Sequence, residues 1–309
     1  MKQKRILITG GAGFIGSHVA DRFIEQGYSV AIVDNVTTGN KVNINPQARF
    51  YPVDIGSQQL KEVFKEERPN YVNHHAAQIS VHSSIRNPIN DAKVNILGSI
   101  NILENCRKFN VKKIIFVSSG GAIYGEPIYL PCDEYHPVNP ISPYGAAKFT
   151  VENYLHLYKR LYGLNFTSLR YANVYGPRQD PKGEAGVIAI FAKAMLEEGN
   201  IVIFGDGNQE RDYVYVSDVV EANLLAIDNK ISGVYNIGTG KGTTLKEIFL
   251  QLSSIVKSHK QPIYEPSRPG DIYKISLDST KAFKELGWKP AVSQKDGLKT
   301  TVEYLIHSK

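Results

Sequence analysis

Three glycines near the start of the chain restrict its fold more than any other feature. Gly10, Gly13 and Gly16 lie in GGAGFIG, which follows the apolar run RILIT (5–9) and precedes a segment of helical periodicity. At such a strand-to-helix turn, glycine permits a tight bend, close approach of a pyrophosphate to backbone N–H groups and close packing of helix on strand. The spacing is G-x-x-G-x-x-G rather than G-x-G-x-x-G, so the position of the turn is what indicates a bound dinucleotide.

Strand-like and helix-like segments alternate through the first half of the chain. Short apolar or β-branched runs lie at 5–9, 28–34, 50–54, 71–74 and 113–118, and helix-like stretches lie near 14–26, 57–67, 88–108 and 143–161. This alternation predicts right-handed βαβ units. Runs such as IIFV lack polar alternation, which is typical of strands covered by helices on both faces. We therefore expect an α/β fold with a Rossmann-type doubly wound parallel sheet.

Acidic side chains end the second and third predicted strands. Asp34 lies 18 residues after Gly16, where a carboxylate can accept hydrogen bonds from an adenosine ribose and would repel a 2′-phosphate. Asp54 is placed to meet the adenine in the same way. NAD is therefore predicted over NADP, and the predicted cofactor site is completed by neighbours of these motifs, namely Phe14, Ile15, Asn35, Ile55, Ala76 and Ala77.

A tyrosine and a lysine follow on one face of a predicted helix. In NPISPYGAAKFTVENYL (139–155), Ser142 suits the N-cap and Pro143 the first helical position, so Tyr144 and Lys148 stand one turn apart. A phenol with a pKa of about 10 is a poor base near neutral pH. A neighbouring ammonium group and a cationic nicotinamide ring would both favour the phenolate, which makes the tyrosine a usable base.

Two serines and two glycines leave the fifth predicted strand. Ser118 and Ser119 precede Gly120 and Gly121 in FVSSGGAIYG (116–125). Residues just past strand ends of a parallel sheet line the ligand site, so a serine hydroxyl there can bind a substrate oxygen, and the glycines let the substrate approach closely. Which of the two serines supplies the hydroxyl stays open.

These segments, in this order, resemble the extended short-chain dehydrogenase/reductase family and, within it, the UDP-glucose 4-epimerases, nearly from end to end. The resemblance implies that the glycine turn and Asp34 hold NAD and that Ser119, Tyr144 and Lys148 are catalytic. The family's asparagine near the nicotinamide side matches Asn95 in KVNILGS. The family's usual Ser or Thr position is Gly120 here, and Ser119 resembles a variant with a double-glycine turn.

The second half carries further segments that resemble the family. They are LRYANVYGPRQ (169–179), IFGDGNQERDYVYVSDV (203–219), YNIGTG (235–240) and RPGDIYKI (268–275). The resemblance implies that Asn173 contacts the nucleotide diphosphate and that Arg211 and Arg268 pair with its phosphates, for which arginine is well suited. It places Asp271 at the uridine ribose and Ile275 beside the sugar's 2-substituent, and Val187 completes the substrate site.

The glycine- and proline-containing loops after about Leu169 indicate a change of organisation. Single cores stop growing at roughly 250–300 residues, and the chain has 309. We expect an NAD-binding domain at 1–170 and a smaller, interleaved nucleotide-sugar-binding α/β domain at 171–309. The boundary is soft, and segments after residue 210 are able to rejoin the first domain.

The implied activity is an NAD-dependent 4-epimerisation of a UDP-sugar through a 4-keto intermediate. Tyr144 takes the proton of the 4-hydroxyl, Arg211 and Arg268 anchor the diphosphate, and Gly120 and Gly121 leave room for the hexose to turn. The hexose is plain (UDP-glucose/UDP-galactose), N-acetylated (UDP-GlcNAc/UDP-GalNAc) or both.

Three alternatives remain beside this reading. A nucleotide-sugar 4,6-dehydratase would carry an acidic pair where this chain has Gly120 and Gly121, or Gly121 and Ala122. A UDP-glucuronate 4-epimerase or decarboxylase needs the same oxidation at carbon 4, so a carboxylated sugar stays open. A non-catalytic NAD or nucleotide-sugar sensor would have no reason to retain a paired tyrosine and lysine.

Composition argues against several other classes of protein. Lys and Arg exceed Asp and Glu by 36 to 30, but the basic residues are scattered, which does not favour nucleic-acid binding. Cys106 and Cys132 lack CxxC spacing, and the adjacent His74 and His75 would point to opposite faces of a strand, so neither a disulfide nor a metal site is predicted.

The absence of a long apolar segment predicts a cytoplasmic protein without membrane contact. The resemblance further implies a homodimer, formed through the helices near 88–108 and 143–161.

Overall fold

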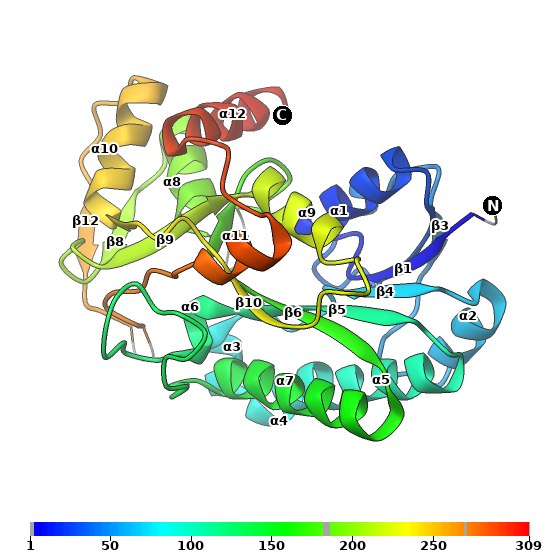
Figure 1. Cartoon of the computed structure of the whole chain (residues 1–309). Coiled ribbons are helices and arrows are strands. Elements are labelled where there is room, and N and C mark those ends of the chain that lie inside the picture. Colours follow the sequence, from blue (N-terminus) through cyan, green and yellow to red (C-terminus); the bar gives the residue numbers. More distant parts are fainter. Residues whose placement is uncertain (1–2, 182–185, 269–270, 309) are drawn as a thin grey trace.

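A parallel sheet forms the centre of the molecule. In the computed structural model, which describes residues 3–181, 186–268 and 271–308, seven strands lie in the order β10-β6-β5-β4-β1-β2-β3 (Figure 1). Their bounds are β1 (Arg5–Thr9), β2 (Ser29–Val33), β3 (Arg49–Tyr51), β4 (Tyr71–His74), β5 (Lys113–Ser119), β6 (Asn165–Tyr171) and β10 (Gly233–Ile237). Every neighbouring pair is parallel. The order reverses between β1 and β4, which is where ligands bind in open α/β sheets.

Helices cover both faces of this sheet. Figure 1 shows α1 (Phe14–Glu25) and α9 (Val216–Leu225) above it, and α5 (Gly98–Lys108) and α7 (Pro143–Tyr162) below it. Successive residues of β1 are buried in different cores: Leu7 packs with the lower helices, while Ile6 and Ile8 pack with α1. Both faces of the strand are therefore apolar, which explains the missing polar alternation and confirms the predicted doubly wound fold.

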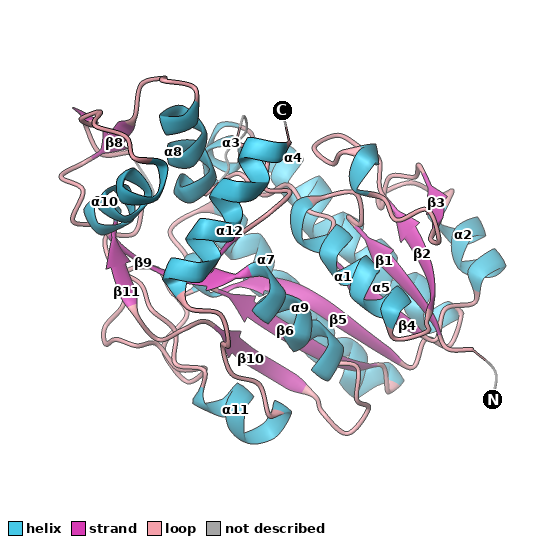
Figure 2. Ribbon diagram, turned by 90° about the horizontal axis from the view of Figure 1, so that it is seen from above, coloured by secondary structure: helices cyan, strands magenta, loops and turns pink. Residues whose placement is uncertain are grey.

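The C-terminal half adds smaller sheets beyond the carboxyl ends of the strands (Figure 2). One has the order β11 (Gly242–Thr244), β9 (Glu210–Tyr215), β7 (Asn173–Tyr175), and the other pairs β12 (Ile263–Glu265) with β8 (Val202–Phe204). They pack with α8 (Val187–Leu196), α10 (Leu245–Val256) and α12 (Gln294–His307) around a core of their own. Between β9 and β11 in the sequence, α9 packs against α1 and β10 joins the large sheet. The two halves are therefore interleaved, and the boundary at residue 170 stays a prediction.

The predicted helix at 88–108 is interrupted. The structure has α4 (Pro88–Ala92), a π-helical turn η2 (Lys93–Leu97) and then α5. Single π turns inside helices occur frequently at functional sites. Here the π turn contains Asn95, whose side chain bonds to the backbone of Gln78, a contact between distant segments that helical periodicity does not reveal.

Several shorter elements complete the fold. They are α2 (Leu60–Glu67), α3 (Val81–Arg86), α6 (Gly120–Ile123), α11 (Thr280–Leu286) and the 3-10 turn η1 (Lys41–Asn43). Among the helices built from described residues, none is long and apolar enough to cross a membrane.

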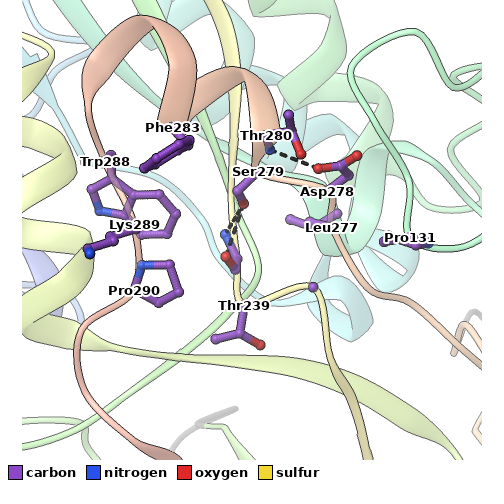
Figure 3. A pocket seen from close by; sticks show the side chains of 12 residues that line it. Pro131, Thr239, Leu277, Asp278, Ser279, Thr280, Phe283, Trp288, Lys289 and Pro290 are labelled. Carbon is purple, nitrogen blue, oxygen red and sulfur yellow. Dashed lines mark hydrogen bonds between the residues drawn. The ribbon is translucent and has the colours of Figure 1, made fainter.

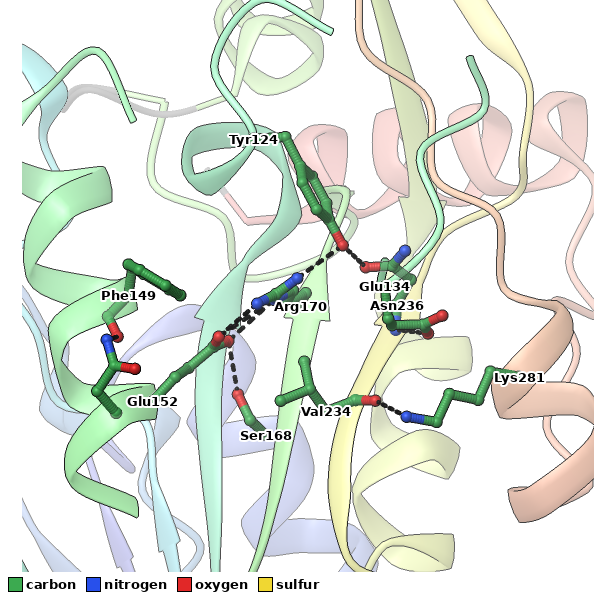
Figure 4. A network of polar contacts seen from close by, with 10 residues as sticks. Tyr124, Glu134, Phe149, Glu152, Ser168, Arg170, Val234, Asn236 and Lys281 are labelled. Atoms are coloured by element: carbon green, nitrogen blue, oxygen red, sulfur yellow. Dashed lines mark hydrogen bonds and ion pairs between the residues drawn. The ribbon is translucent and has the colours of Figure 1, made fainter. Parts of the chain in front are cut away.

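A buried polar network fixes α7 to the sheet (Figure 4). Arg170 of β6 forms an ion pair with Glu152 of α7 at 2.6 Å, and Ser168 donates to the same carboxylate at 2.9 Å. Arg170 also donates to the Tyr124 hydroxyl, which in turn donates to Asn236 of β10. Every member of this chain of contacts lies in the interior, so it holds α7 on strand β6 and links β6 to Asn236 of β10 through Tyr124.

Replacing Arg170 by Met should strongly destabilise the protein, because the Glu152 carboxylate would stay buried without its partner. A loss of about 3 kcal/mol in the free energy of unfolding is expected. The measurement is urea unfolding followed by the fluorescence of Trp288, the single tryptophan of the chain. Arg107→Met is the control, since Arg107 and Glu104 form an exposed pair. Equal losses for the two variants would contradict the role of the buried pair.

Candidate functional site

The glycine turn lies at the point where the strand order reverses. Gly10 has a φ of +70°, and a Cβ on it would stand 2.6 Å from the backbone nitrogen of Ala76, which follows β4. A Cβ on Gly16 would collide with the carbonyl oxygen of Gly10. Gly13 caps α1 without any side chain. Side chains at Gly10 and Gly16 would therefore clash with the backbone. Without them, the backbone N–H groups of the turn can approach a dinucleotide pyrophosphate closely.

The predicted adenosine side of the site is hydrogen-bonded internally. The Asp34 carboxylate accepts from the backbone nitrogens of Ala12 at 3.0 Å and Val36 at 2.8 Å. Asn35 donates to Asp54 at 2.7 Å, so two of the predicted adenosine contacts touch each other. Each carboxylate oxygen retains a second lone pair for a ribose hydroxyl. Asp34 thus shapes the glycine turn, and its contact with the ribose stays a prediction.

The other predicted cofactor residues next to these motifs contact mainly the protein's own core and backbone. Phe14 and Ile15 open α1 and are partly buried. Ile55 is buried, with its side chain against Gly98 and its carbonyl oxygen accepting from Asn101, so this side chain belongs to the core. Ala76, like its neighbour Ala77, follows β4, and its backbone nitrogen donates to the Thr9 hydroxyl at 3.1 Å.

Two neutral histidines end β4 beside the glycine turn. His74 is fully bonded, to the Thr9 hydroxyl at 2.7 Å and the Ser99 hydroxyl at 3.0 Å, which agrees with a packing role. His75 follows directly, before Ala76, and its buried Nε2 atom has no hydrogen-bond partner in the part of the chain that the structure describes. Burial, helped by the Lys148 charge, lowers the pKa of both imidazoles to about 3. His75 was not among the predicted site residues, although its position after a strand end was the available signal.

The predicted tyrosine and lysine occupy the first turns of α7. Ser142 caps this helix by accepting from the backbone nitrogen of Gly145 at 3.1 Å. Lys148 is 4% exposed, and its Nζ donates to the carbonyl oxygen of Val117 at 2.8 Å and lies 5.8 Å from the centre of the Tyr144 ring. The helix and strand β5 therefore bring phenol and ammonium together.

Burial acts in opposite senses on these two groups. It raises the pKa of Tyr144 to about 12, and a hydrogen bond with Ser119 opposes this shift. It lowers the pKa of Lys148 to about 8, whereas the charges of Asp91 and Glu152 raise it. Of the two serines, Ser119 is the one that contacts Tyr144. The hydroxyl of Ser118 is buried without a hydrogen-bond partner among the described residues and faces away from Tyr144, because successive residues of a strand point to opposite faces.

The two glycines after β5 have different surroundings. A Cβ on Gly120 would stand 2.5 Å from a methyl carbon of Leu277, so the space beside Gly120 is taken by this core side chain. A Cβ on Gly121 would stand 3.6 Å from the side-chain oxygen of Asn173, another predicted substrate contact. The absence of a side chain at Gly121 therefore leaves open space beside this turn. The absence of one at Gly120 allows Leu277 to pack against the backbone.

The predicted phosphate-binding arginines come from different segments. Arg211 of β9 is held by the carbonyl oxygens of Glu210 at 3.0 Å and Tyr273 at 3.3 Å. The Arg268 guanidinium stacks 3.5 Å from the centre of the Phe204 ring. Neither arginine forms an ion pair with any residue that the structure describes. Guanidinium groups without carboxylate partners suit an anionic ligand. Phe204, at the end of β8, was missed because its contact spans distant segments.

The remaining predicted substrate residues lie near these arginines or at element ends. Asp271 is exposed and follows residues 269–270 of the RPGDIYKI segment, which lie outside the described residues. Ile275 is buried, and its backbone nitrogen donates to the carbonyl oxygen of Glu210, the neighbour of Arg211. Val187 is the first residue of α8.

A separate pocket of about 280 Å³ lies behind this region (Figure 3). Phe283, Trp288 and Pro290 line it on one side, and Thr239 and Ser279 line it on the other. It contains none of the predicted site residues, but Leu277 belongs to its wall and also packs against Gly120. Leu277 therefore separates this pocket from the turn after β5. Within the described chain, no group of three or more metal-ligating side chains is found.

Comparisons with known proteins agree with this geometry. The model of the NAD dependent epimerase/dehydratase family matches residues 6–238. A UDP-glucose 4-epimerase of Mycolicibacterium smegmatis is 42% identical over 306 residues, covering 97% of this chain and 98% of the relative.

Solved structures are similar over the whole chain. The structure of the UDP-glucose 4-epimerase of Thermotoga maritima with UDP-glucose has 53% identity and a TM-score of 0.96, covering 98% of this chain and 99% of that one. The UDP-N-acetylglucosamine 4-epimerase of Methanobrevibacter ruminantium, in complex with UDP-N-acetylmuramic acid, has 36% identity, a TM-score of 0.94 and full coverage of both chains. Sequence, fold and site together show that this chain belongs to the NAD-dependent epimerase/dehydratase family.

Proposed function

We propose that the protein is an NAD-dependent 4-epimerase that acts on UDP-sugars. The observation that carries this proposal is the pairing of Tyr144 with Ser119 and Lys148 at the carboxyl end of β5, beside a glycine turn that fits a dinucleotide. The likeness to UDP-glucose 4-epimerases over nearly the whole chain supports the substrate class.

The chain's own residues supply proton transfer and orientation. The glycine turn and Asp34 would hold NAD, which would supply hydride transfer at carbon 4 of the sugar. Tyr144 accepts the proton of the 4-hydroxyl during oxidation and returns it during reduction. The Lys148 ammonium favours the phenolate form of Tyr144, and Ser119 hydrogen-bonds the oxygen on carbon 4.

Anchoring of the diphosphate lets the hexose turn between the two steps. Arg211 and Arg268, which form no ion pair with any described residue, provide guanidinium groups for the phosphates, and Asn173 lies at the open side of Gly121. The position beside Gly120 is filled by Leu277, and no acidic side chain lies at 120 or 121. A 4,6-dehydratase needs an acid and a base there, so epimerisation is favoured over elimination of water.

Replacing Tyr144 by Phe should lower kcat by about 10²–10⁴-fold, because the proton acceptor is lost. NAD affinity, followed by calorimetric titration, should change little, since the phenol oxygen is the only atom removed. Tyr162→Phe, on the exposed end of the same helix, is the matched control and should leave both quantities unchanged. Substantial residual turnover in the Tyr144 variant would contradict its assigned role.

Substrate assays test the function itself. Purified protein is incubated with UDP-glucose, UDP-N-acetylglucosamine and UDP-glucuronate separately, and the sugar isomers are separated by chromatography. We expect UDP-galactose from UDP-glucose, and the ratio of turnover on the first two substrates reports the space beside Ile275. Formation of no isomer from any of the three would refute the epimerase proposal.

A homodimer is proposed through the helices below the sheet. α5 and α7 lie side by side there (Figure 1). Leu157 and Leu161 of α7 and Leu97 of η2 are exposed large apolar side chains on these elements. Such faces pair readily in a four-helix arrangement between two copies.

The double substitution Leu157→Glu with Leu161→Glu should convert a dimer into a monomer, because it places charge in the apolar contact. Light scattering should give twice the 34.4 kDa chain mass for the unmodified protein and a single chain mass for the variant. Leu250→Glu, at an equally exposed leucine of α10, should not change the mass. A monomeric unmodified protein would contradict the proposal.

A further inference from the structure

Lys148 lies in the interior without an ion-pair partner among the described residues. Its Nζ donates to a neutral carbonyl oxygen, that of Val117. A buried ammonium is costly unless a negative charge lies nearby. The proposed mechanism needs this lysine as an ammonium, so the source of the compensating charge has to be found among its neighbours.

Several elements contribute titratable groups to the surroundings of Lys148. β4 contributes His74 and His75, which are neutral. α7 contributes Glu152, whose charge also raises the pKa of Lys148 but is partly offset by its ion pair with Arg170. η2 contributes Lys93, which is exposed, and α3 contributes His82 and Arg86, which carry no negative charge. α4 contributes Asp91, which forms no ion pair within the described chain and is 1% exposed.

Asp91 sits in a fully bonded polar cluster on elements that pack against α7. Its Oδ1 atom accepts from Gln78 at 2.8 Å and from Asn95 at 2.9 Å. The Asn95 amide also pairs with the Gln78 backbone, accepting from its nitrogen at 2.8 Å and donating to its oxygen at 2.9 Å. Burial raises the pKa of the Asp91 carboxyl, and the two N–H donors on one carboxylate oxygen, together with the Lys148 charge, oppose this shift and favour the ionised form. The cluster spans the π turn η2 and the segment just after β4.

We propose that Asp91 is a positioning residue for chemistry at carbon 4: its carboxylate fixes the Gln78–Asn95 cluster and supplies the charge that keeps Lys148 an ammonium beside Tyr144. This inference rests on the proposed function, because it concerns the same tyrosine and lysine. The Asp91 charge raises the pKa of Lys148 and also that of Tyr144. The Asp91 charge therefore keeps Lys148 an ammonium up to a higher pH, and it also makes the Tyr144 phenol less acidic.

The sign of the pH effect follows from these two influences. Activity needs Tyr144 deprotonated and Lys148 protonated, so the two limbs of the pH profile report the pKa values of these two groups. Asp91→Asn removes the charge but keeps an oxygen that accepts from Gln78 and Asn95. Both limbs of the kcat profile should then move to lower pH, by about half a unit to one unit. A merely structural role would lower kcat at every pH by one factor and leave the limbs in place, which would overturn the proposal.

Three further variants serve as controls for the pH profile of Asp91→Asn. Asp91→Glu retains the charge and should keep limbs close to those of the unmodified protein. Asp218→Asn is the matched control, since Asp218 is a buried carboxylate, 4% exposed, on α9 at the other face of the sheet. It should leave both limbs unchanged. Asp91→Ser is a second neutral variant, for use if Asp91→Asn fails to unfold cooperatively.

A second measurement does not depend on turnover. The protein is labelled with ¹³C-lysine, and the Lys148 resonance is assigned by its loss in Lys148→Met. Its midpoint should lie near pH 8 in the unmodified protein and lower in Asp91→Asn. An unchanged midpoint in Asp91→Asn would overturn the inference even if the enzyme is active. A shifted midpoint in a protein that epimerises none of the tested sugars would support it and refute the proposed function.

Discussion

The buried ion pair between Glu152 and Arg170 determines where α7 lies on the sheet, and α7 carries both Tyr144 and Lys148. The pair ties the middle of the helix to β6, and the Tyr124 and Asn236 contacts extend the tie to β10. One turn before Glu152, Lys148 reaches the end of β5 and bonds to Val117. The distance from the lysine to the tyrosine, and from both to the Ser119 hydroxyl, thus depends on a charge pair that itself touches no ligand.

The same pair has an electrostatic consequence. Arg170 offsets part of the Glu152 charge, so Glu152 acts on Lys148 beside Asp91 and not as its sole carboxylate neighbour. The interior at this point holds one ammonium, two neutral imidazoles and the Asp91 carboxylate. In such a place a single charge has a large effect, since little solvent screens it. An acid–base site therefore depends on residues in four different elements.

The features that could be predicted from the sequence are those encoded by neighbouring residues in the chain. The glycine turn and the Tyr144–Lys148 helix were predicted because a strand, a turn, a cap and a helical spacing are all encoded within some twenty neighbouring residues. The fold class followed from the alternation of such segments. Contacts between distant segments were not foreseen: the π turn at Asn95 bonded to Gln78, the filling of the Gly120 side by Leu277, and Arg268 stacked on Phe204. None of these leaves a periodic pattern, since each depends on where the sheet brings two separate segments.

Asp34 illustrates how closely cofactor choice and backbone shape are joined in this protein. Its carboxylate is the predicted partner of the adenosine ribose, and it accepts from Ala12 inside the glycine turn and from Val36 beyond it. A basic residue at this position, introduced to bind a 2′-phosphate, would leave both backbone nitrogens without their acceptor, and an asparagine, with one side-chain oxygen, would leave one of them. A change of cofactor preference at this position therefore also changes the support of the glycine turn.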